Sequence, residues 1–381
     1  MSVETDAQRA RVSPPHRAID IFTLDSLGEV FMKNSVLLIV NSGIRTSIDS
    51  ALTQYISDLK HIEGYAVIVH EASGGSAFDL KQYITEQYHA LSRSKPLAGC
   101  VLIGDLPVPW YGNAVDKYPI DLFYMDLNGD WDDTDQDGII DQCPVQPDPV
   151  IWIGRLAAGA LSGDEAALLN SYFTKNHSYR NGMLNVPNRA MAYVDDDWIP
   201  KGDYGLSSAY ADVTVIHDVM VTNASDYKSK LTEKYEFLHS AVHSSSSAHT
   251  FKNNYVWDGS VTAAEIRNIN SQPVFYCIDA CQAARYTEAD YIGGWYIFSP
   301  GLGLAFIGET KNANSMDGPA EFYSLFGGGL CLGDAFITWL RTRSAYHIDR
   351  TILGDPTLKR RSHYSPANTA PPAPPSGLRV S

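Results

Sequence analysis

Two residues that could form a nucleophile and its base follow strand-like runs in the second half of the chain. The run VFYCIDAC (274–281) ends at Cys281, and the run YEFLHSAVHS (235–244) ends beside His243. A cysteine attacks as a thiolate, and its ordinary pKa of about 8.5 means that a neighbouring group must take the proton at neutral pH. An imidazole can accept that proton and later give it to a leaving amine. The pair therefore predicts acyl-transfer chemistry.

Other interpretations of these residues compete with this one. A lone cysteine is more often a buried structural thiol than a nucleophile, and Cys277, inside the apolar run, is best explained in that way. His239 is expected in the middle of its strand and packed. His243 instead meets the polar SSSS segment, where a substrate could reach it, and His249 lies beyond that segment. Position along the strands therefore favours His243 with Cys281.

Apolar runs of strand length alternate with helix-like stretches from residue 35 onward, which predicts an α/β fold with a mostly parallel sheet flanked by helices. Such continuous apolar runs suit strands that are buried on both faces. Two groups of strands separate near residues 157–185, so two side-by-side subdomains are expected. The expected strands are 35–41, 65–72, 98–105, 149–156, 189–195, 212–218, 235–244, 273–281 and 303–310, and the expected helices lie near 46–61, 78–93, 163–178, 223–234, 262–269 and 317–345.

The carboxyl ends of the expected strands form a list of candidate site residues, because open parallel sheets bind ligands at that edge. The polar residues at those ends are Asp105, Asp195 to Asp197, His243 with Ser244, and Cys281. A carboxylate, an imidazole and a thiol therefore share the edge where chemistry is expected.

The order of these pieces resembles the clan of cysteine peptidases that holds caspases, legumains and clostripain, and most closely its gingipain family. The resemblance covers much of residues 98–360. It is carried by VLIGD (101–105), VIWIGRL (150–156), EFLHSAVHS (236–244), PVFYCIDAC (273–281), GLAFIGET (303–310) and LGDPTL (353–358). It implies a caspase-like fold and a peptidase activity.

The resemblance also implies roles for single residues. Cys281 would be the nucleophile, His243 the general base and acid, and the backbone N–H groups of Cys281 and Ser244 the oxyanion donors. The family has a glycine at the position of Ser244. A carboxylate that orients the histidine would follow RAMAYVD; Asp196 is the first choice and Asp195 the second, where the family has a glutamate. A solvated loop or a metal site is the alternative for these aspartates.

Two further carboxylates could select the substrate. Asp279 lies two residues before Cys281 and should share its face of the strand. Clostripain-like relatives have the same Asp-Ala-Cys order, and there the aspartate faces the pocket for a basic side chain; Asp203 is the nearest match to the acidic residue of gingipains. A carboxylate suits a guanidinium or an ammonium. We therefore expect cleavage after Arg or Lys, with a backbone-bonding role for Asp279 as the alternative.

The acidic segment DLNGDWDDTDQDGIID (126–141) predicts a calcium site, because Ca²⁺ takes six to eight oxygen ligands and needs a sharp turn among them. The first nine positions of an EF-hand-type loop fit, but the twelfth is Pro144 instead of a bidentate glutamate. A structural role is expected, and a solvated acidic loop is the alternative. The expected ligands are Asp133, Asp135, Asp137, Ile139 and Asp141, with Asp126, Asn128 and Asp130 as further donors.

Composition and the ends of the chain bound the remaining choices. The 381 residues carry a net charge of −15 without a Lys/Arg-rich run, so nucleic acid is a poor partner, and the sequence lacks the run of about 18 apolar residues that a membrane span needs. We expect an N-terminal extension or pro-segment remnant (1–34), a first subdomain (35–180), a catalytic subdomain (181–362) and a Pro-rich linker (363–381). PPSGLRV in that linker resembles the start of a fibronectin type III domain.

These features predict a secreted or cell-surface cysteine endopeptidase that acts on proteins or peptides, belongs to a longer multidomain protein and is stabilised by calcium. Two alternatives remain open. A transpeptidase or sorting enzyme of the same fold would pass the acyl group to an amine instead of water, through the same thioester. A catalytically inactive surface module would use the fold only for binding.

Overall fold

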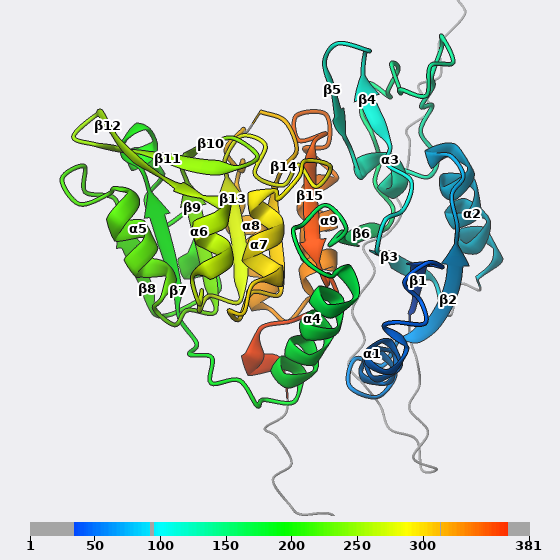
Figure 1. Cartoon of the computed structure of the whole chain (residues 1–381), viewed down its shortest axis with the longest axis horizontal. Helices are drawn as coiled ribbons and strands as arrows, with labels where there is room; N and C mark the ends of the chain where they lie inside the picture. Colours follow the sequence, from blue (N-terminus) through cyan, green and yellow to red (C-terminus); the bar gives the residue numbers. More distant parts are fainter. Residues whose placement is uncertain (1–33, 92–94, 313, 365–381) are drawn as a thin grey trace, which may run out of the picture. The chain divides into compact units, whose positions relative to one another are not determined.

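A central sheet of ten strands organises the residues that the computed structural model describes, which are 34–91, 95–312 and 314–364. The order across the sheet is β2-β1-β3-β6-β15-β14-β13-β9-β7-β8 (Figure 1). The bounds of the strands are β1 (Ser35–Asn41), β2 (Ala66–Ala72), β3 (Leu97–Ile103), β6 (Trp152–Leu156), β7 (Ala190–Val194), β8 (Val213–Ile216), β9 (Phe237–Ala241), β13 (Phe275–Asp279), β14 (Ala305–Glu309) and β15 (Arg350–Gly354).

Neighbouring strands of this sheet are parallel except for one pair. β14 and β15 run antiparallel, with Ile307 opposite Ile352, so the strands on the two sides of this pair point in opposite directions. The prediction of a mostly parallel sheet flanked by helices is therefore confirmed. Both predicted subdomains contribute strands to the same sheet, and the boundary between them at residue 180 stays a prediction.

Strand formation follows from continuous apolar runs. Every residue of β9 and of β13 is buried, and so are all residues of β1 except Asn41. Strands that are covered on both faces need no alternation of apolar and polar side chains, and β-branched and aromatic residues suit the pleated surface. The apolar core is accordingly continuous from β1 to β7.

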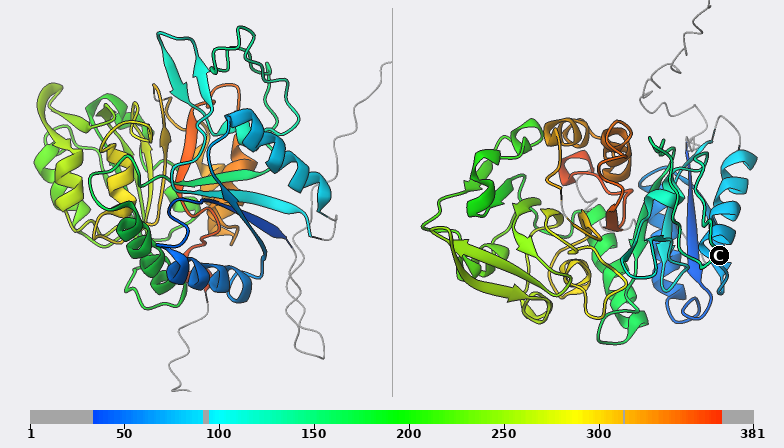
Figure 2. Two further views of the ribbon diagram at one scale, coloured as in Figure 1. Left: turned by 45° about the vertical axis from the view of Figure 1, so that its right-hand side comes forward. Right: turned by 90° about the horizontal axis from the view of Figure 1, so that it is seen from above.

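Helices cover both faces of the sheet. α1, α4, α5, α6 and α7 lie on one face, and α2, α8 and α9 lie on the other (Figures 1 and 2). The bounds are α1 (Asp49–His61), α2 (Ala77–Ala90), α3 (Leu122–Met125), α4 (Glu165–Arg180), α5 (Ala224–Leu231), α6 (Ala263–Asn268), α7 (Ile292–Phe298), α8 (Pro319–Gly327) and α9 (Leu332–Leu340), with short 3₁₀ turns η1 (Asp196–Lys201), η2 (Leu206–Ser208) and η3 (Arg361–His363).

Side-chain caps fix where several helices begin. Ser76 accepts from the amide of Asp79 at 3.1 Å, and Asp79 accepts from the amide of Ser76 at 2.8 Å, which makes a capping box at the start of α2. Thr262 and Glu265 form the same motif before α6. These bonds satisfy amide groups that the first turn of a helix leaves without partners.

Two small sheets lie outside the main one. β10 (His243–Ser244), β11 (Ala248–Asn253) and β12 (Val256–Thr262) form an antiparallel sheet beside the carboxyl ends of β9 and β13 (Figure 1). β4 (Trp110–Gly112) and β5 (Lys117–Pro119) form a hairpin in the segment that leads to the acidic loop. The sequence patterns predicted neither of these sheets.

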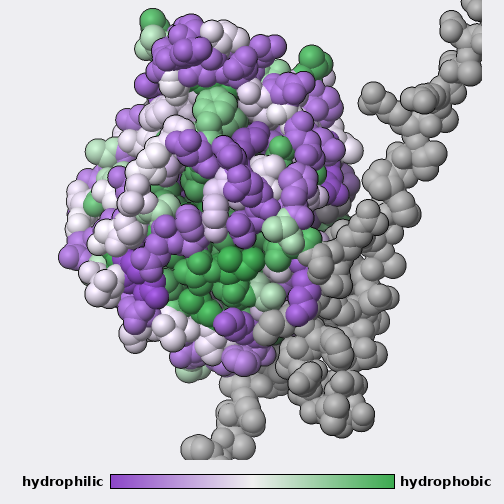
Figure 3. All heavy atoms as spheres, turned by 90° about the vertical axis from the view of Figure 1, so that its right-hand side faces the viewer, coloured by the Kyte–Doolittle hydropathy of each residue, from purple (hydrophilic) through white to green (hydrophobic). Residues whose placement is uncertain are grey.

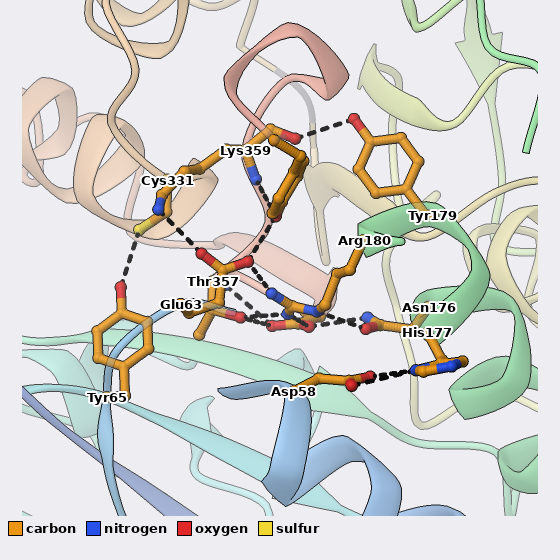
Figure 4. Close-up of polar contacts among 12 residues, drawn as sticks. Asp58, Glu63, Tyr65, Asn176, His177, Tyr179, Arg180, Cys331, Thr357 and Lys359 are labelled. Carbon is orange, nitrogen blue, oxygen red and sulfur yellow. Dashed lines mark hydrogen bonds and ion pairs between the residues drawn. The ribbon is translucent and has the colours of Figure 1, made fainter. Parts of the chain in front are cut away.

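A buried ionic cluster joins segments that are far apart in the sequence (Figure 4). Arg180, near the end of α4, pairs with Glu63 after α1 and with Asp355 after β15, and all three side chains are fully buried. Asn176 donates to Asp355 at 2.8 Å, and the Tyr364 hydroxyl donates to Glu63 at 2.6 Å. The cluster gives LGDPTL (353–358) a structural role, because its aspartate, Asp355, accepts hydrogen bonds from both Arg180 and Asn176.

The side of the molecule that carries β2 is shown in Figure 3, where apolar residues gather in one patch among polar ones. β2 is an edge strand of the sheet, and Val67, Ile68 and Val69 are each partly exposed on it. Within the described ranges, every helix falls short of the length and hydropathy that a membrane crossing needs. The predicted extension and linker lie outside the described residues, apart from Asn34, His363 and Tyr364.

We expect the Arg180 cluster to be essential for stability. The substitution Arg180→Ala leaves the buried carboxylate of Asp355 without its cation and leaves Glu63 with Lys359 alone, and breaking a buried ion pair in this way costs about 3–5 kcal/mol of the free energy of unfolding. Urea denaturation measures this. The matched control is Lys228→Ala, which removes a half-exposed pair with Glu265 and should cost about 1 kcal/mol or less. An Arg180→Ala loss no larger than that of the control would contradict the role of the cluster.

Candidate active site

Two parallel neighbours, β9 and β13, bring His243 and Cys281 to the same edge of the sheet. The strands pair in register up to Ala241 opposite Asp279, and the amide of Val242 still donates to the carbonyl of Asp279 at 3.3 Å. His243 and Cys281 each follow two residues after that last registered pair. The edge at the carboxyl ends of parallel strands is where this class of sheet binds ligands.

A third strand end supplies the carboxylates. The amide of Asp195, directly after β7, donates to the carbonyl of Ala241 at 3.0 Å, so the three aspartates begin where β9 ends. Asp197 reaches the imidazole: its Oδ2 lies 2.7 Å from Nε2 of His243 and 2.6 Å from Nζ of Lys252. These two hydrogen bonds lower the pKa of Asp197, which keeps the carboxylate ionised and able to stabilise an imidazolium.

Asp196, the residue expected to orient the histidine, lies elsewhere. Its carboxylate accepts from the Thr222 hydroxyl at 2.9 Å and from the backbone amide of Tyr255. Asp195 is fully buried and accepts from the amide of Lys252 at 3.1 Å. The turn η1 begins directly after β7, so successive aspartates leave the strand in different directions. Only Asp197 is carried to His243, and the other two hold the β11–β12 hairpin.

The other histidines of this region are enclosed. His239 is fully buried in β9, where its Nδ1 lies 2.6 Å from the Tyr323 hydroxyl, and burial lowers its pKa. His249 is also fully buried, and burial lowers its pKa to about 3. His243 is partly exposed. Of these three imidazoles, His243 is therefore the one that a substrate can approach.

The chain turns sharply after Cys281. Gln282 has a φ of 58°, and its amide donates to the carbonyl of Lys311 at 2.6 Å. A positive φ is uncommon for a residue other than glycine and costs on the order of 1 kcal/mol, so surrounding contacts must hold it. The backbone that carries the thiol is thus fixed by the segment after β14. Cys281 itself is half-buried.

Ser244 keeps an ordinary backbone conformation in β10, so a serine at this position meets no positive-φ strain. Its hydroxyl lies 2.9 Å from Nδ1 of His249. The amide of Ser245 donates to the carbonyl of Ala248 at 2.9 Å, which makes these two residues a hydrogen-bonded pair. Because such pairs alternate along antiparallel strands, the N–H of Ser244 points away from β11.

Asp279 lies inside the protein and not at the surface of a pocket. Its carboxylate accepts from Arg350 Nη2 at 2.8 Å and from the amide of Met316 at 2.9 Å, and His239 lies 3.4 Å away. Burial opposes ionisation, but Arg350 and His239 outweigh it and hold the pKa of Asp279 below its usual range. Arg350 also pairs with Glu309. Asp279 was expected to bind a basic side chain of the substrate, and this expectation is wrong because Arg350 of the same chain already pairs with its buried carboxylate.

A cavity of about 240 Å³ lies next to this buried cluster. Tyr204 lines it and stacks on His239 at 3.9 Å between ring centroids, and Met316 lines it beside Asp279. Asp203 precedes Tyr204 and accepts from the amides of Gly205 at 2.9 Å and Ser207 at 3.1 Å, so it shapes the loop that borders the cavity. The complete lining is Lys201, Tyr204, Gly205, Met316, Asp317, Gly318, Pro319 and Ala320.

The acidic loop brings three of the expected calcium ligands together. One oxygen from each of Asp133, Asp135 and Asp137 lies within 4.8 Å of the others. Asp133 also accepts from the amide of Gly138 at 2.8 Å, and Gly138 has a φ of 85°, which suits glycine at the sharp turn. Desolvation and repulsion by Asp137 raise the pKa of Asp135, as expected for crowded carboxylates.

The remaining expected ligands have other positions. Asp126 is buried and accepts from the amide of Gly129 at 3.0 Å and from the indole of Trp131 at 3.1 Å. Asp141 accepts from the amide of Thr134 at 3.1 Å. Asn128 and Asp130 are exposed and Ile139 is buried; none of them belongs to the three-carboxylate cluster.

Comparison with known proteins places the fold. No protein-family model and no curated protein sequence matches the chain. Among solved structures, the Arg-specific cysteine proteinase gingipain R (RgpB) superposes with a TM-score of 0.60 at 14% identity, covering 87% of this chain and 79% of that one. The chain has a gingipain-like fold.

Two further solved structures agree. A protein described only as a protease matches with a TM-score of 0.60 and 16% identity over 87% of this chain and 80% of that one. RgpB in a complex of pro- and mature domains from Porphyromonas gingivalis matches with a TM-score of 0.60 and 14% identity over 86% and 79%. The gingipain-like fold that the sequence motifs led us to expect is confirmed.

Substitution of Asp196 and substitution of Asp197 should have different effects on hydrogen exchange at the Tyr255 amide. The substitution Asp196→Ala removes the acceptor of the Tyr255 amide and should speed exchange of that amide at least tenfold, because a freed amide no longer needs local opening. Asp197→Ala is the matched control, since its carboxylate bonds side chains and not this amide. Equal protection of the Tyr255 amide in both variants would contradict the assignment.

Proposed function

We propose that this chain is a cysteine endopeptidase in which Cys281 is the nucleophile and His243 the general base and acid. The observation that carries the proposal is the register of β9 and β13, which sets both residues two positions beyond the same rung of the sheet. The bond from Nε2 of His243 to Asp197 adds a fixed orientation of the ring. This bond leaves Nδ1 as the ring nitrogen that serves the thiol.

The chemistry follows from these roles. Nδ1 of His243 takes the thiol proton, and the sulfur of Cys281 forms a bond to the peptide carbonyl carbon. The negative oxygen accepts from the N–H groups of Cys281 and Ser244, of which the second points away from β11. The C–N bond then breaks as His243 returns the proton to the leaving amine, and water hydrolyses the thioester. Asp197 stabilises the imidazolium between these steps.

We propose that the enzyme cleaves peptide bonds after Arg or Lys. The cavity beside the nucleophile strand suits one side chain, and Asp317 and the loop held by Asp203 border it. Asp279 does not bind the substrate side chain in this arrangement, because its carboxylate already pairs with Arg350. Lys201 also lines the cavity, so an acidic substrate residue is the competing possibility.

We further propose that calcium binds the acidic loop through Asp133, Asp135 and Asp137, with the carbonyl of Ile139 as a further donor. The clustered carboxylates and the turn at Gly138 support this. A site that lacks a bidentate glutamate suits the millimolar range of extracellular modules. This fits the proposal of an exported or cell-surface protein.

A panel of fluorogenic peptides tests the activity. Peptides that differ only in the residue before the cut should be hydrolysed when that residue is Arg or Lys. Cys281→Ala should abolish turnover, because among the residues that the structure describes only this cysteine lies two positions beyond the last registered pair of β9 and β13. Cys277→Ala is the control for loss of a nearby thiol, since Cys277 is fully buried below the edge.

The outcomes separate the parts of the proposal. Turnover after residues other than Arg or Lys that still needs Cys281 would overturn only the specificity. Turnover that survives in Cys281→Ala would overturn the assignment of Cys281 as the nucleophile, and no turnover with any peptide in the wild-type protein would overturn the peptidase itself.

Calorimetric titration tests the metal. We expect calcium to bind with a Kd of about 0.1–1 mM. At tenfold excess over Kd the ion should stabilise the fold by about 1.4 kcal/mol. Asp133→Ala should abolish binding, whereas Asp130→Ala, in the same loop but outside the three-carboxylate cluster, should not. Equal effects of the two substitutions would contradict the assigned ligands.

A further inference from the structure

Two tryptophans contact the imidazole of His243. The ring centroids of Trp198 and Trp257 lie 4.6 and 4.9 Å from that of the histidine. Trp198 is partly exposed, and Trp257 keeps 57% of its surface exposed. A large aromatic surface that stays open to solvent beside a reactive group is available to a ligand. The proposed mechanism uses neither indole.

The fold holds the exposed indole in place at some cost. Trp257 follows the two-residue turn of the β11–β12 hairpin, in which Asn254 and Tyr255 have φ values of 51° and 63°. A type I′ hairpin turn has positive φ at both central positions, and a tyrosine adopts it less readily than glycine. The Asp196 carboxylate compensates by accepting from the Tyr255 amide.

Neighbouring charges leave the indole surface apolar in character. Lys252 lies over the Trp257 ring at 4.9 Å, but its ammonium is paired with Asp197 at 2.6 Å. Asp197 is in turn paired with His243. The charged groups next to the two indoles thus neutralise one another. An acidic or basic ligand side chain finds no unpaired partner among these three residues, whereas an apolar one gains contact area.

The atom that His243 protonates determines which part of a substrate lies beside the two tryptophans. A general acid must come within about 3 Å of the atom that it protonates, here the nitrogen of the leaving amine. The residue that follows the scissile bond carries this nitrogen. Its side chain therefore passes beside the ring of His243, where Trp198 and Trp257 lie.

We infer that Trp198 and Trp257 form the binding surface for the residue after the scissile bond and select an apolar or aromatic side chain there. The inference rests on the proposed peptidase function and adds a specificity on the leaving-group side. Tyr255 and Val256, at the tip of the hairpin, are also exposed and extend the apolar surface away from His243.

The test uses peptides that share the preferred residue before the cut and differ only in the residue after it. We expect kcat/KM to be about threefold to tenfold higher with Phe or Leu than with Gly or Asp, the size of an aromatic contact of about 1 kcal/mol. Trp257→Ala should bring the Phe-to-Gly ratio close to one, and Trp257→Phe should retain most of it. Met183→Ala, which removes an exposed apolar residue between α4 and β7, should keep the wild-type ratio.

A methyl ester of the same acyl part separates the two proposals, because its leaving group has no side chain. If the ester and all peptides resist the wild-type protein, the peptidase assignment is wrong and this inference falls with it. If the ester is cleaved but the peptides show no preference for Phe or Leu, the peptidase stands and the tryptophan surface is overturned. An unchanged Phe-to-Gly ratio in Trp257→Ala would overturn it as well.

Discussion

The antiparallel strand β15 is the constraint on which the rest of the structure depends. It lies in the middle of the sheet, and its first residue, Arg350, pairs with Asp279 of β13 and Glu309 of β14. The next residue, Thr351, donates at 2.6 Å to Asp121, the carboxylate that pairs with the fully buried guanidinium of β6. Buried charges are tolerated only when each has its partners. Every strand that carries one of these groups is therefore fixed relative to β15, including β13, which leads to Cys281.

Sequence patterns predicted the fully buried strands other than β15, because burial on both faces produces a continuous apolar run, and they also predicted the two partly exposed edge strands β2 and β8. All nine expected strands are present. β15 was missed because it begins with a charged residue whose partners are distant in the sequence. β12 was missed because nearly all of its residues are exposed, so its sequence lacks the alternation of apolar and polar residues that marks a half-buried strand. The helix expected over 317–345 is two helices, α8 and α9, separated by a glycine-rich turn in which Gly329 has a φ of 102°.

The site was predictable only as far as strand ends define it. Because ligands bind at the carboxyl ends of parallel strands, recognising two such strands was enough to place His243 and Cys281 at the same edge of the sheet. This rule could not choose among three consecutive aspartates, since that choice depends on the direction of η1 and on Tyr255 and Lys252 in a hairpin about 55 residues away. In the same way, the sequence could not reveal the partner of Asp279, because the arginine that pairs with it lies 71 residues along the chain and leaves no local pattern.

The loop after β7 links the histidine of the proposed mechanism to the proposed substrate surface. Asp197 holds the ring of His243, while Asp196 and Asp195 hold the hairpin that presents Trp257 to the same ring. Lys252 belongs to both sets, because its amide bonds Asp195 and its ammonium bonds Asp197. The orientation of the imidazole and the position of the indole are thus set by one short segment. A movement of the hairpin would disturb the contacts of Asp197 with Lys252 and His243, which couples the two proposed roles, substrate contact at the hairpin and proton transfer at His243.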